Sequence, residues 1–172
     1  MGERYFIMVD YQRCTGCKLC ETACSLTKTG TVNPAKSRIR VIVKPHIGVD
    51  VPILCYHCED PPCINACPVG AMHRDERGVV VIDEEKCIGC KACIMQCPFG
   101  AIFFDPDKRV AIKCDLCGGD PMCVKVCNEA FPEDRVLTYV KPKDAAKWKM
   151  LMRVKQIEEG ILKTYGAEPL VR

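Results

Sequence analysis

Sixteen cysteines dominate the chemistry that this 172-residue sequence can perform. They form four groups of four, and in every group three residues separate the third cysteine from the last. No cysteine is left over. Thiolates bind soft metal ions and iron–sulfur clusters, and thiols also pair as disulfides. The groups are Cys14, Cys17, Cys20, Cys24; Cys55, Cys58, Cys63, Cys67; Cys87, Cys90, Cys93, Cys97; and Cys114, Cys117, Cys123, Cys127.

The third group has the spacing that binds [4Fe–4S] clusters in pairs. It reads CIGCKACIMQCP, and in such a run the first three cysteines hold one cubane while the fourth holds its neighbour. The second group has four residues between Cys58 and Cys63, and the fourth has five between Cys117 and Cys123. These longer loops can still close around a cube corner. We therefore expect four [4Fe–4S] clusters.

In this motif the last cysteine of a group binds the cluster of another group. Applying this crossing rule to all four groups assigns every ligand. The two middle groups exchange their last cysteines with each other. The first and last groups can obey the rule only by the same exchange, which joins them in space. The predicted ligands are Cys14, Cys17, Cys20 and Cys127 (cluster 1); Cys24, Cys114, Cys117 and Cys123 (cluster 2); Cys55, Cys58, Cys63 and Cys97 (cluster 3); and Cys67, Cys87, Cys90 and Cys93 (cluster 4).

Zinc and disulfides are the alternatives to iron. CxxC pairs also build zinc ribbons, but those join two hairpins that lie a dozen or more residues apart. A zinc-binding interaction module remains an alternative, which iron analysis would separate. Disulfides need an oxidising compartment, and the N-terminal sequence MGERYFIMVDYQRC carries no secretion signal. The apolar runs are too short to cross a membrane. We expect a cytoplasmic protein with no membrane insertion.

The formal charge of +3 belongs to the chain with neutral cysteines. A cluster with four thiolate ligands carries roughly −2, so four clusters would shift the net charge by about −8, to about −5. Lysine and arginine are also spread along the sequence instead of forming a basic block. We therefore expect no nucleic-acid partner.

The elements that must position the clusters are duplicated in the middle of the chain. Cys67-Pro-Val-Gly-Ala and Cys97-Pro-Phe-Gly-Ala are each followed by a turn and a β-branched run, VVVID or RVAIK. Each unit predicts a cluster loop, a short helix through the final cysteine, and a hairpin. This is the βαβ-type alternation of a small bacterial ferredoxin, and it places an inner lobe at residues 51–113.

The flanking segments predict a second lobe around the first. Strands are expected at Tyr5–Val9, Ser37–Val43 and Val136–Val140, with a loop over Thr27–Lys36. The expected fold is α+β, with two bacterial-ferredoxin-like lobes, one inserted in the other, each binding two [4Fe–4S] clusters. The outer lobe is discontinuous and comprises residues 1–50 and 114–140.

Residues 141–172 carry good helix formers and no cysteine. Pro142 suits the first helical position, and apolar residues recur at helical spacing after it. The segment therefore predicts a C-terminal helical arm, which also holds the only tryptophan, Trp148. The apolar stripe consists of Ala146, Met150, Val154, Ile157 and Ile161.

The order and spacing of all sixteen cysteines resemble the four-cluster, polyferredoxin-like electron-transfer subunits of the dimethyl-sulfoxide-reductase and formate-dehydrogenase type. The resemblance covers about residues 4–140 and rests also on CxxCEDPPCxxxCPxGA, KCIGCKACxxxCPFGA and KCDLCGGDPxCVKVC. It implies the same crossed ligand pairing and a chain of clusters between two docking surfaces. One departure is Asn128, where the motif usually has proline.

The resemblance implies a non-catalytic subunit that passes electrons. The overall length and the motifs SRIRV and KCDLCGGDP are similar to the small subunits of tungsten- or molybdenum-pterin aldehyde oxidoreductases. Such a catalytic subunit and a second electron donor or acceptor protein are the expected partners. A freestanding polyferredoxin and a carbon-monoxide-dehydrogenase electron carrier are the alternatives. The sequence has no CxxCH haem motif and no GxGxxG dinucleotide loop.

Four further residues adjoin the ligands. His57 could donate to a cluster sulfur and make its potential depend on pH, although an exposed loop histidine is the simpler interpretation. Lys18, Lys91 and Lys113 could favour the reduced, more negative clusters, or they could be solvated.

Overall fold

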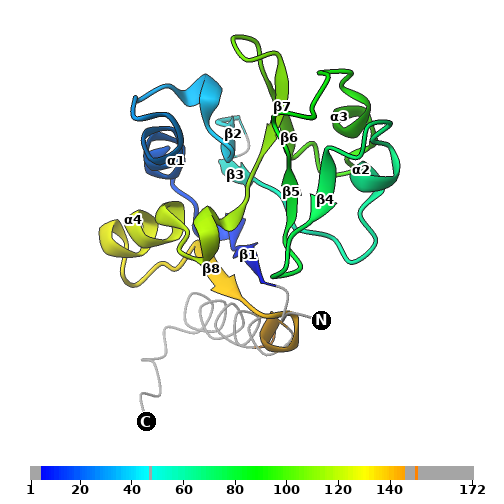
Figure 1. Ribbon diagram of the computed structural model, residues 1–172. Coiled ribbons are helices and arrows are strands. Elements are labelled where there is room, and N and C mark those ends of the chain that lie inside the picture. The colour runs from blue at the N-terminus through cyan, green and yellow to red at the C-terminus, as the bar shows by residue number, and fades with distance from the viewer. Residues whose placement is uncertain (1–4, 47, 146–149, 151–172) are drawn as a thin grey trace, which may run out of the picture.

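The computed structural model describes residues 5–46, 48–145 and 150 (Figure 1). Within these residues the strands form four two-stranded sheets, all antiparallel, with helices between them. The fold therefore mixes helices with small antiparallel sheets. No helix in the described part of the chain is long and apolar enough to cross a membrane.

The two ends of the described chain meet in one sheet. β1 (Phe6–Val9) pairs with β8 (Leu137–Val140), so that Ile7 lies opposite Tyr139. This pairing places the segment before the first cysteine group beside the segment after the last one. The strands predicted at residues 5–9 and 136–140 are confirmed, each shortened by one residue.

A second hairpin contains a strand outside the predicted set. β2 (Arg40–Lys44) pairs with β3 (Val49–Ile53), and Pro52 lies opposite Val41. The strand predicted at residues 37–43 is displaced toward the C-terminus. The boundary predicted between residues 50 and 51 falls within β3, since the whole of β3 is paired with β2.

The two predicted middle hairpins are confirmed. β4 (Met72–Arg74) pairs with β5 (Val80–Ile82), and β6 (Ile102–Asp105) pairs with β7 (Val110–Lys113). In the first hairpin the Asp75 carboxylate accepts from the backbone N–H groups of Arg77 and Val79 at 3.0 and 2.8 Å. Asp105 starts the second turn in the same way. A side-chain cap of this kind holds the turn and sets the hairpin register.

The helices lie in two pairs. α1 (Leu19–Thr29) packs against α4 (Met122–Ala130), and α2 (Pro62–Asn65) packs against α3 (Ala92–Gln96). Figure 1 shows the first pair at the left and the second at the right, with the hairpins between them. Short 3-10 turns lie at Tyr11–Arg13, Pro34–Lys36 and Leu116–Gly119.

The predicted helix through the final cysteine is wrong for the two middle groups. α2 ends before Cys67 and α3 ends before Cys97. Proline follows each of these cysteines, and the residue before a proline is pushed out of the helical region; Cys97 is accordingly extended, with φ −77° and ψ 111°. In the first and last groups Ser25 and Asn128 replace the proline, and the helices run on.

The loop predicted at residues 27–36 is partly helical. α1 continues through Thr29 and ends at Gly30, whose φ of 70° and bond to the Leu26 carbonyl form a left-handed C-cap. Residues 142–145 are helical. The rest of the predicted C-terminal arm and its stripe, Met150 excepted, lies outside the described residues.

Two clusters of buried residues form the core. The larger one joins both ends of the chain to the middle, because Val79 and Ala101 pack into it together with Ile7 and Leu137. The smaller one lies between the middle hairpins and the α2–α3 pair, and consists of Cys63, Met72, Val80, Cys93, Ile102 and Ala111. Cysteines belong to both of these groups of buried residues, so the thiols lie within the hydrophobic core.

Candidate metal centre

Each group of cysteines follows one local plan. The first two cysteines lie before the helix, in a loop or, for Cys117, in a 3-10 turn, and the third is the second residue of the helix that follows. This holds for α1, α2, α3 and α4 alike, with Cys20, Cys63, Cys93 and Cys123 at that position. The repeat in sequence is therefore a repeat in structure.

The residue before the second cysteine is left-handed in all four groups. Its φ is 67° at Gly16, 47° at His57, 68° at Gly89 and 59° at Leu116. Glycine adopts this region freely, whereas histidine and leucine enter it under strain. Both larger side chains are fully buried, at 0% exposure, so packing holds them there. The sequence signal for this turn was visible only where glycine stands.

Three of the predicted ligand sets line hollows in the structure. Cys14, Cys17, Cys20 and Cys127 line one with roughly 380 Å³ of space free of atoms, including the solvent at its mouth. The sets predicted for clusters 3 and 4 line hollows of roughly 330 and 340 Å³. In each hollow the cysteine from the partner group lies beside the other three.

The fourth set also comes together. Cys24 lies on α1, which packs against α4, and Arg38 donates its N–H to the sulfur of Cys24 while its guanidinium pairs with Asp115 beside Cys114. Burial raises the pKa of Cys123, and the nearby thiols of Cys114, Cys24, Cys117 and Cys20 raise it further. The structure thus brings Cys24 to the last group, as the crossing of the final cysteine requires.

Burial dominates the electrostatics of the thiols. It raises the pKa of Cys20 and of Cys114 to about 12, and the pKa of Cys63 and of Cys93 to about 11. Neighbouring cysteines add to the rise in Cys20, Cys63 and Cys93, because like charges oppose one another. Without a metal these thiols are protonated, so metal binding must release protons.

Backbone amides point at several sulfurs. The N–H groups of Arg38, His57 and Ala101 donate to the sulfurs of Cys24, Cys55 and Cys97 at 3.3, 3.3 and 3.4 Å. Burial raises the pKa of Cys67, but the N–H groups of Met72, Val69, Ala71 and Gly70 outweigh it and lower that pKa overall. Amides of this kind stabilise negative charge on sulfur and help to set a cluster's potential.

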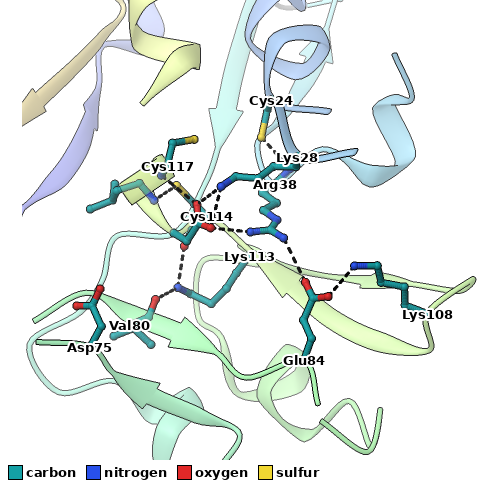
Figure 2. Close-up of polar contacts among 12 residues, drawn as sticks. Cys24, Lys28, Arg38, Asp75, Val80, Glu84, Lys108, Lys113, Cys114 and Cys117 are labelled. Atoms are coloured by element: carbon teal, nitrogen blue, oxygen red, sulfur yellow. Dashed lines mark hydrogen bonds and ion pairs between the residues drawn. The ribbon is translucent and has the colours of Figure 1, made fainter. Parts of the chain in front are cut away.

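Charged side chains lie beside Cys114 and Cys117 of the fourth group (Figure 2). The Asp115 carboxylate pairs with Lys28 at 2.7 Å and with Arg38 at 2.8 Å, and it accepts from the N–H of Cys117 at 3.0 Å. The guanidinium of Arg38 also reaches Glu84, which pairs with Lys108. One network thereby joins α1, the fourth cysteine loop and the segment after β5.

Two interpretations of residues beside the ligands need correction. His57 is fully buried, so an exposed loop histidine is wrong; burial and then the charge of Lys113 lower its pKa to about 3. Lys113 is 3% exposed and is not solvated.

The ammonium of Lys91 lies 4.4 Å from the centroid of the Phe104 ring, which is a cation–π contact.

The donor set fits iron–sulfur clusters. No carboxylate or imidazole appears among the residues that line the three hollows; four cysteines and mainly apolar side chains do. Four thiolates in a mostly apolar pocket with amides aimed at sulfur are the surroundings of a [4Fe–4S] cluster. When bound, such a cluster accepts and releases single electrons.

Comparison with known protein families also indicates iron–sulfur clusters. The family described as "4Fe-4S dicluster domain" matches residues 49–132, and the one described as "4Fe-4S binding domain" matches residues 11–30. The chain is an iron–sulfur protein. Its sixteen cysteines fit four [4Fe–4S] clusters.

Curated relatives of this iron–sulfur protein belong to oxidoreductases. It is 48% identical over 91 residues to the "aliphatic sulfonate oxidoreductase, polyferredoxin-like subunit" of Pyrococcus furiosus, covering 52% of each protein. It is 41% identical over 103 residues to one component of the anaerobic dimethyl sulfoxide reductase of Escherichia coli K12, covering 53% of this protein and 50% of the relative. The "thiosulfate reductase electron transfer subunit PhsB" of Salmonella typhi is 37% identical over 98 residues, covering 52% and 50%. The protein thus spans about half the length of the curated relatives it matches.

A solved structure also aligns with most of the iron–sulfur protein. It belongs to the "active site complex BamBC of Benzoyl Coenzyme A reductase", covers 95% of this chain and 92% of its own, and shows 26% identity with a TM-score of 0.47.

Proposed function

We propose that this iron–sulfur protein is the electron-transfer subunit of a multi-subunit oxidoreductase. It relays single electrons through four [4Fe–4S] clusters between a catalytic subunit and a second redox partner. The observation that carries the proposal is the gathering of the sixteen cysteines into sets of four, three of them around hollows. The names of the relatives support an electron-transfer role.

The proposed ligands follow the crossed pairing. The thiols that share a hollow or act on one another electrostatically support it. The proposed architecture is two ferredoxin-like lobes, one inserted in the other. Since β3 pairs with β2, we place the first boundary after Ile53, giving an outer lobe of residues 1–53 and 114–140 and an inner lobe of residues 54–113.

The clusters follow one another in the order 1, 2, 3, 4. One buried core contains Cys20 of cluster 1, Cys114 and Cys123 of cluster 2, and Cys55 of cluster 3, which supports cluster 2 lying between clusters 1 and 3. The packing of α2, with Cys63 of cluster 3, against α3, with Cys93 of cluster 4, supports the last step of the order. The two exposed cysteines, Cys17 and Cys90, belong to clusters 1 and 4. Electrons therefore enter and leave at these two ends, where a partner's cofactor can come close.

The catalytic partner that the sequence motifs favour is a tungsten- or molybdenum-pterin oxidoreductase of the aldehyde-oxidising kind. The match to a subunit of an aliphatic sulfonate oxidoreductase supports a dedicated oxidoreductase partner over a freestanding polyferredoxin or a carbon-monoxide-dehydrogenase carrier. In either of those alternatives the same clusters would shuttle electrons without a permanent catalytic subunit.

The test is anaerobic purification of the tagged chain from its native host. We expect a catalytic subunit to co-purify in a fixed ratio, to contain tungsten or molybdenum, and to reduce the clusters when its substrate is added. A chain that purifies alone, and whose clusters no co-expressed oxidoreductase reduces, would contradict the proposal.

The C-terminal segment is proposed to dock the chain on its partner. It lies beyond the last cysteine, so cluster binding does not require it. It also holds the only tryptophan of the sequence, a large apolar side chain suited to a docking surface. Deleting residues 143–172 should leave the iron content nearly unchanged and weaken association with the catalytic subunit. If the truncated chain loses its clusters and the surviving holo-protein binds normally, the segment is structural.

A further inference from the structure

A buried lysine stands between the second and third clusters. Lys113 ends β7, directly before the ligand Cys114, and it is 3% exposed. Its ammonium donates to the carbonyl of Val80 on β5 and, at 2.8 Å, to the carbonyl of Cys114 (Figure 2). These two acceptors fix the charge at the point where the β4–β5 hairpin meets the fourth cysteine loop.

The charge of Lys113 reaches cysteines of two clusters. One of its acceptors is the carbonyl of Cys114, a ligand proposed for cluster 2, and the other is the carbonyl of Val80, which lines the hollow of the set proposed for cluster 3. Cys55 and Cys114, one from each of these two sets, also belong to the same buried part of the core. Lys113 therefore lies at the step where an electron passes from one lobe to the other.

No carboxylate in the described part of the chain forms an ion pair with Lys113. The other cations nearby do have carboxylate partners, since Lys28 pairs with Asp115, and Arg38 pairs with Asp115 and Glu84. A buried charge is costly unless opposite charge compensates it. Two clusters with their thiolates, each carrying net negative charge, supply that compensation.

The repeat provides an internal comparison. Lys86 precedes Cys87 as Lys113 precedes Cys114, so the two lysines occupy the same position in the third and fourth groups. The side chain of Lys86 is 66% exposed and pairs with Asp83 at 3.0 Å. Water and Asp83 screen its charge, whereas the interior leaves that of Lys113 unscreened.

We propose that Lys113 is an electrostatic positioning residue for electron transfer, whose fixed positive charge raises the reduction potentials of clusters 2 and 3 together. Reduction adds one negative charge to a cluster, and a nearby cation stabilises the reduced form. Because one charge acts on both clusters, it lowers the energy of the reduced state of each cluster at the junction of the lobes. The inference rests on the proposed relay of electrons, and deepens it.

The test is an EPR-monitored redox titration of the full-length, four-cluster protein and its variants. In Lys113→Met we expect two of the four midpoint potentials to fall, each by roughly a tenfold change in the equilibrium constant for reduction, about 59 mV for one electron. The other two should stay in place. Lys86→Met is the matched control and should shift none of the four by that amount.

Two further variants separate charge from structure. Lys113→Gln keeps a hydrogen-bond donor without the charge, and Lys113→Arg keeps the charge. If the charge matters, the potentials fall in the Gln variant and stay in place in the Arg variant. Unchanged potentials in a fully loaded Met or Gln variant would overturn the inference. Loss of iron in all three variants would also overturn it, because Lys113 would then serve the fold.

These results are independent of the partner. Shifted potentials in a protein that never associates with a catalytic subunit would support the role of Lys113 while contradicting the proposed function. Normal co-purification with unshifted potentials would support the proposed function while contradicting the role of Lys113.

Discussion

The backbone oxygen of Arg109 lies so close to Gly89 that a Cβ on this glycine would stand 2.3 Å from it. Gly89 precedes the second cysteine of the third group, and Arg109 ends the turn between β6 and β7. The absence of a side chain therefore lets that turn pack directly onto the third cysteine loop. Gly16 in the first group is also crowded, but by a side chain: a Cβ would stand 2.6 Å from the carboxylate of Asp50 on β3.

Gly89→Ala should release the cluster held by the third group. The left-handed φ of 68° costs alanine about 1–2 kcal/mol, and the overlap with a backbone atom cannot be relieved by a rotamer change. Gly100→Ala is the matched control, because its φ is 60° and nothing lies within 4 Å of the added Cβ. We expect iron to fall by about four atoms per chain in Gly89→Ala and to stay near the wild-type value in Gly100→Ala. Equal iron contents would contradict the contact as the cause.

The complete protein should contain about sixteen iron atoms and sixteen acid-labile sulfides per chain when it is made without oxygen. The reason is that four full sets of thiolates are available, with no cysteine left over. Metal and sulfide analysis of the anaerobically purified chain measures this directly. Stoichiometric zinc with little iron would establish the zinc-binding alternative.

The cysteine pattern and the two middle hairpins could be predicted because both are encoded locally. Spacing alone defines the cysteine groups, and Asp75 and Asp105 cap turns that Gly, Pro and Asp already mark in the sequence. The early ends of α2 and α3 are also encoded locally, by Pro68 and Pro98. The predicted helix through the last cysteine did not take these prolines into account.

Other features depend on packing that the sequence does not display. β3 carries Pro52, which argues against a strand, yet it is tolerated in a two-stranded sheet. The burial of Lys113 cannot be read locally, since Lys86 has the same position in the repeat and lies in water. His57 likewise looks like a loop residue, and only the folded core encloses it.

Asp115→Asn should loosen the fourth cysteine loop. The substitution keeps an acceptor for the N–H of Cys117 but removes the negative charge that Lys28 and Arg38 share. Hydrogen bonds to charged groups contribute about 1.5–3 kcal/mol each, so we expect a loss of about 1–3 kcal/mol after solvent screening. For a chain of this size, that lowers the thermal midpoint by about 2–4 °C per kcal/mol.

Asp120→Asn is the control for that experiment. Asp120 lies in the same loop and pairs with Lys125 at 2.5 Å, but its side chain is 68% exposed. Exposed pairs contribute about 0–1 kcal/mol, so the melting temperature should hardly change. An Asp120→Asn variant that melts as early as Asp115→Asn would mean that the network in Figure 2 adds nothing to stability.

The crossed pairing predicts different partners for two cysteines on one helix. Cys20 and Cys24 lie one turn apart on α1. The charges of Cys127 and Cys14 act on Cys20, whereas that of Cys117 acts on Cys24, whose sulfur also accepts the N–H of Arg38. Cys24→Ala should therefore damage the cluster held by the last group, and Cys20→Ala the one held by the first.

Iron counts in double variants decide between this pairing and clusters built from single groups. Substitutions in the same cluster are not additive, because a cluster can be lost only once. Under crossed pairing, Cys24→Ala with Cys117→Ala should lose about four iron atoms, no more than either single variant, while Cys24→Ala with Cys20→Ala should lose about eight. If each group held its own cluster, these two results would be exchanged. Iron and sulfide analysis of the two double variants, beside their single parents, is enough to separate the two arrangements.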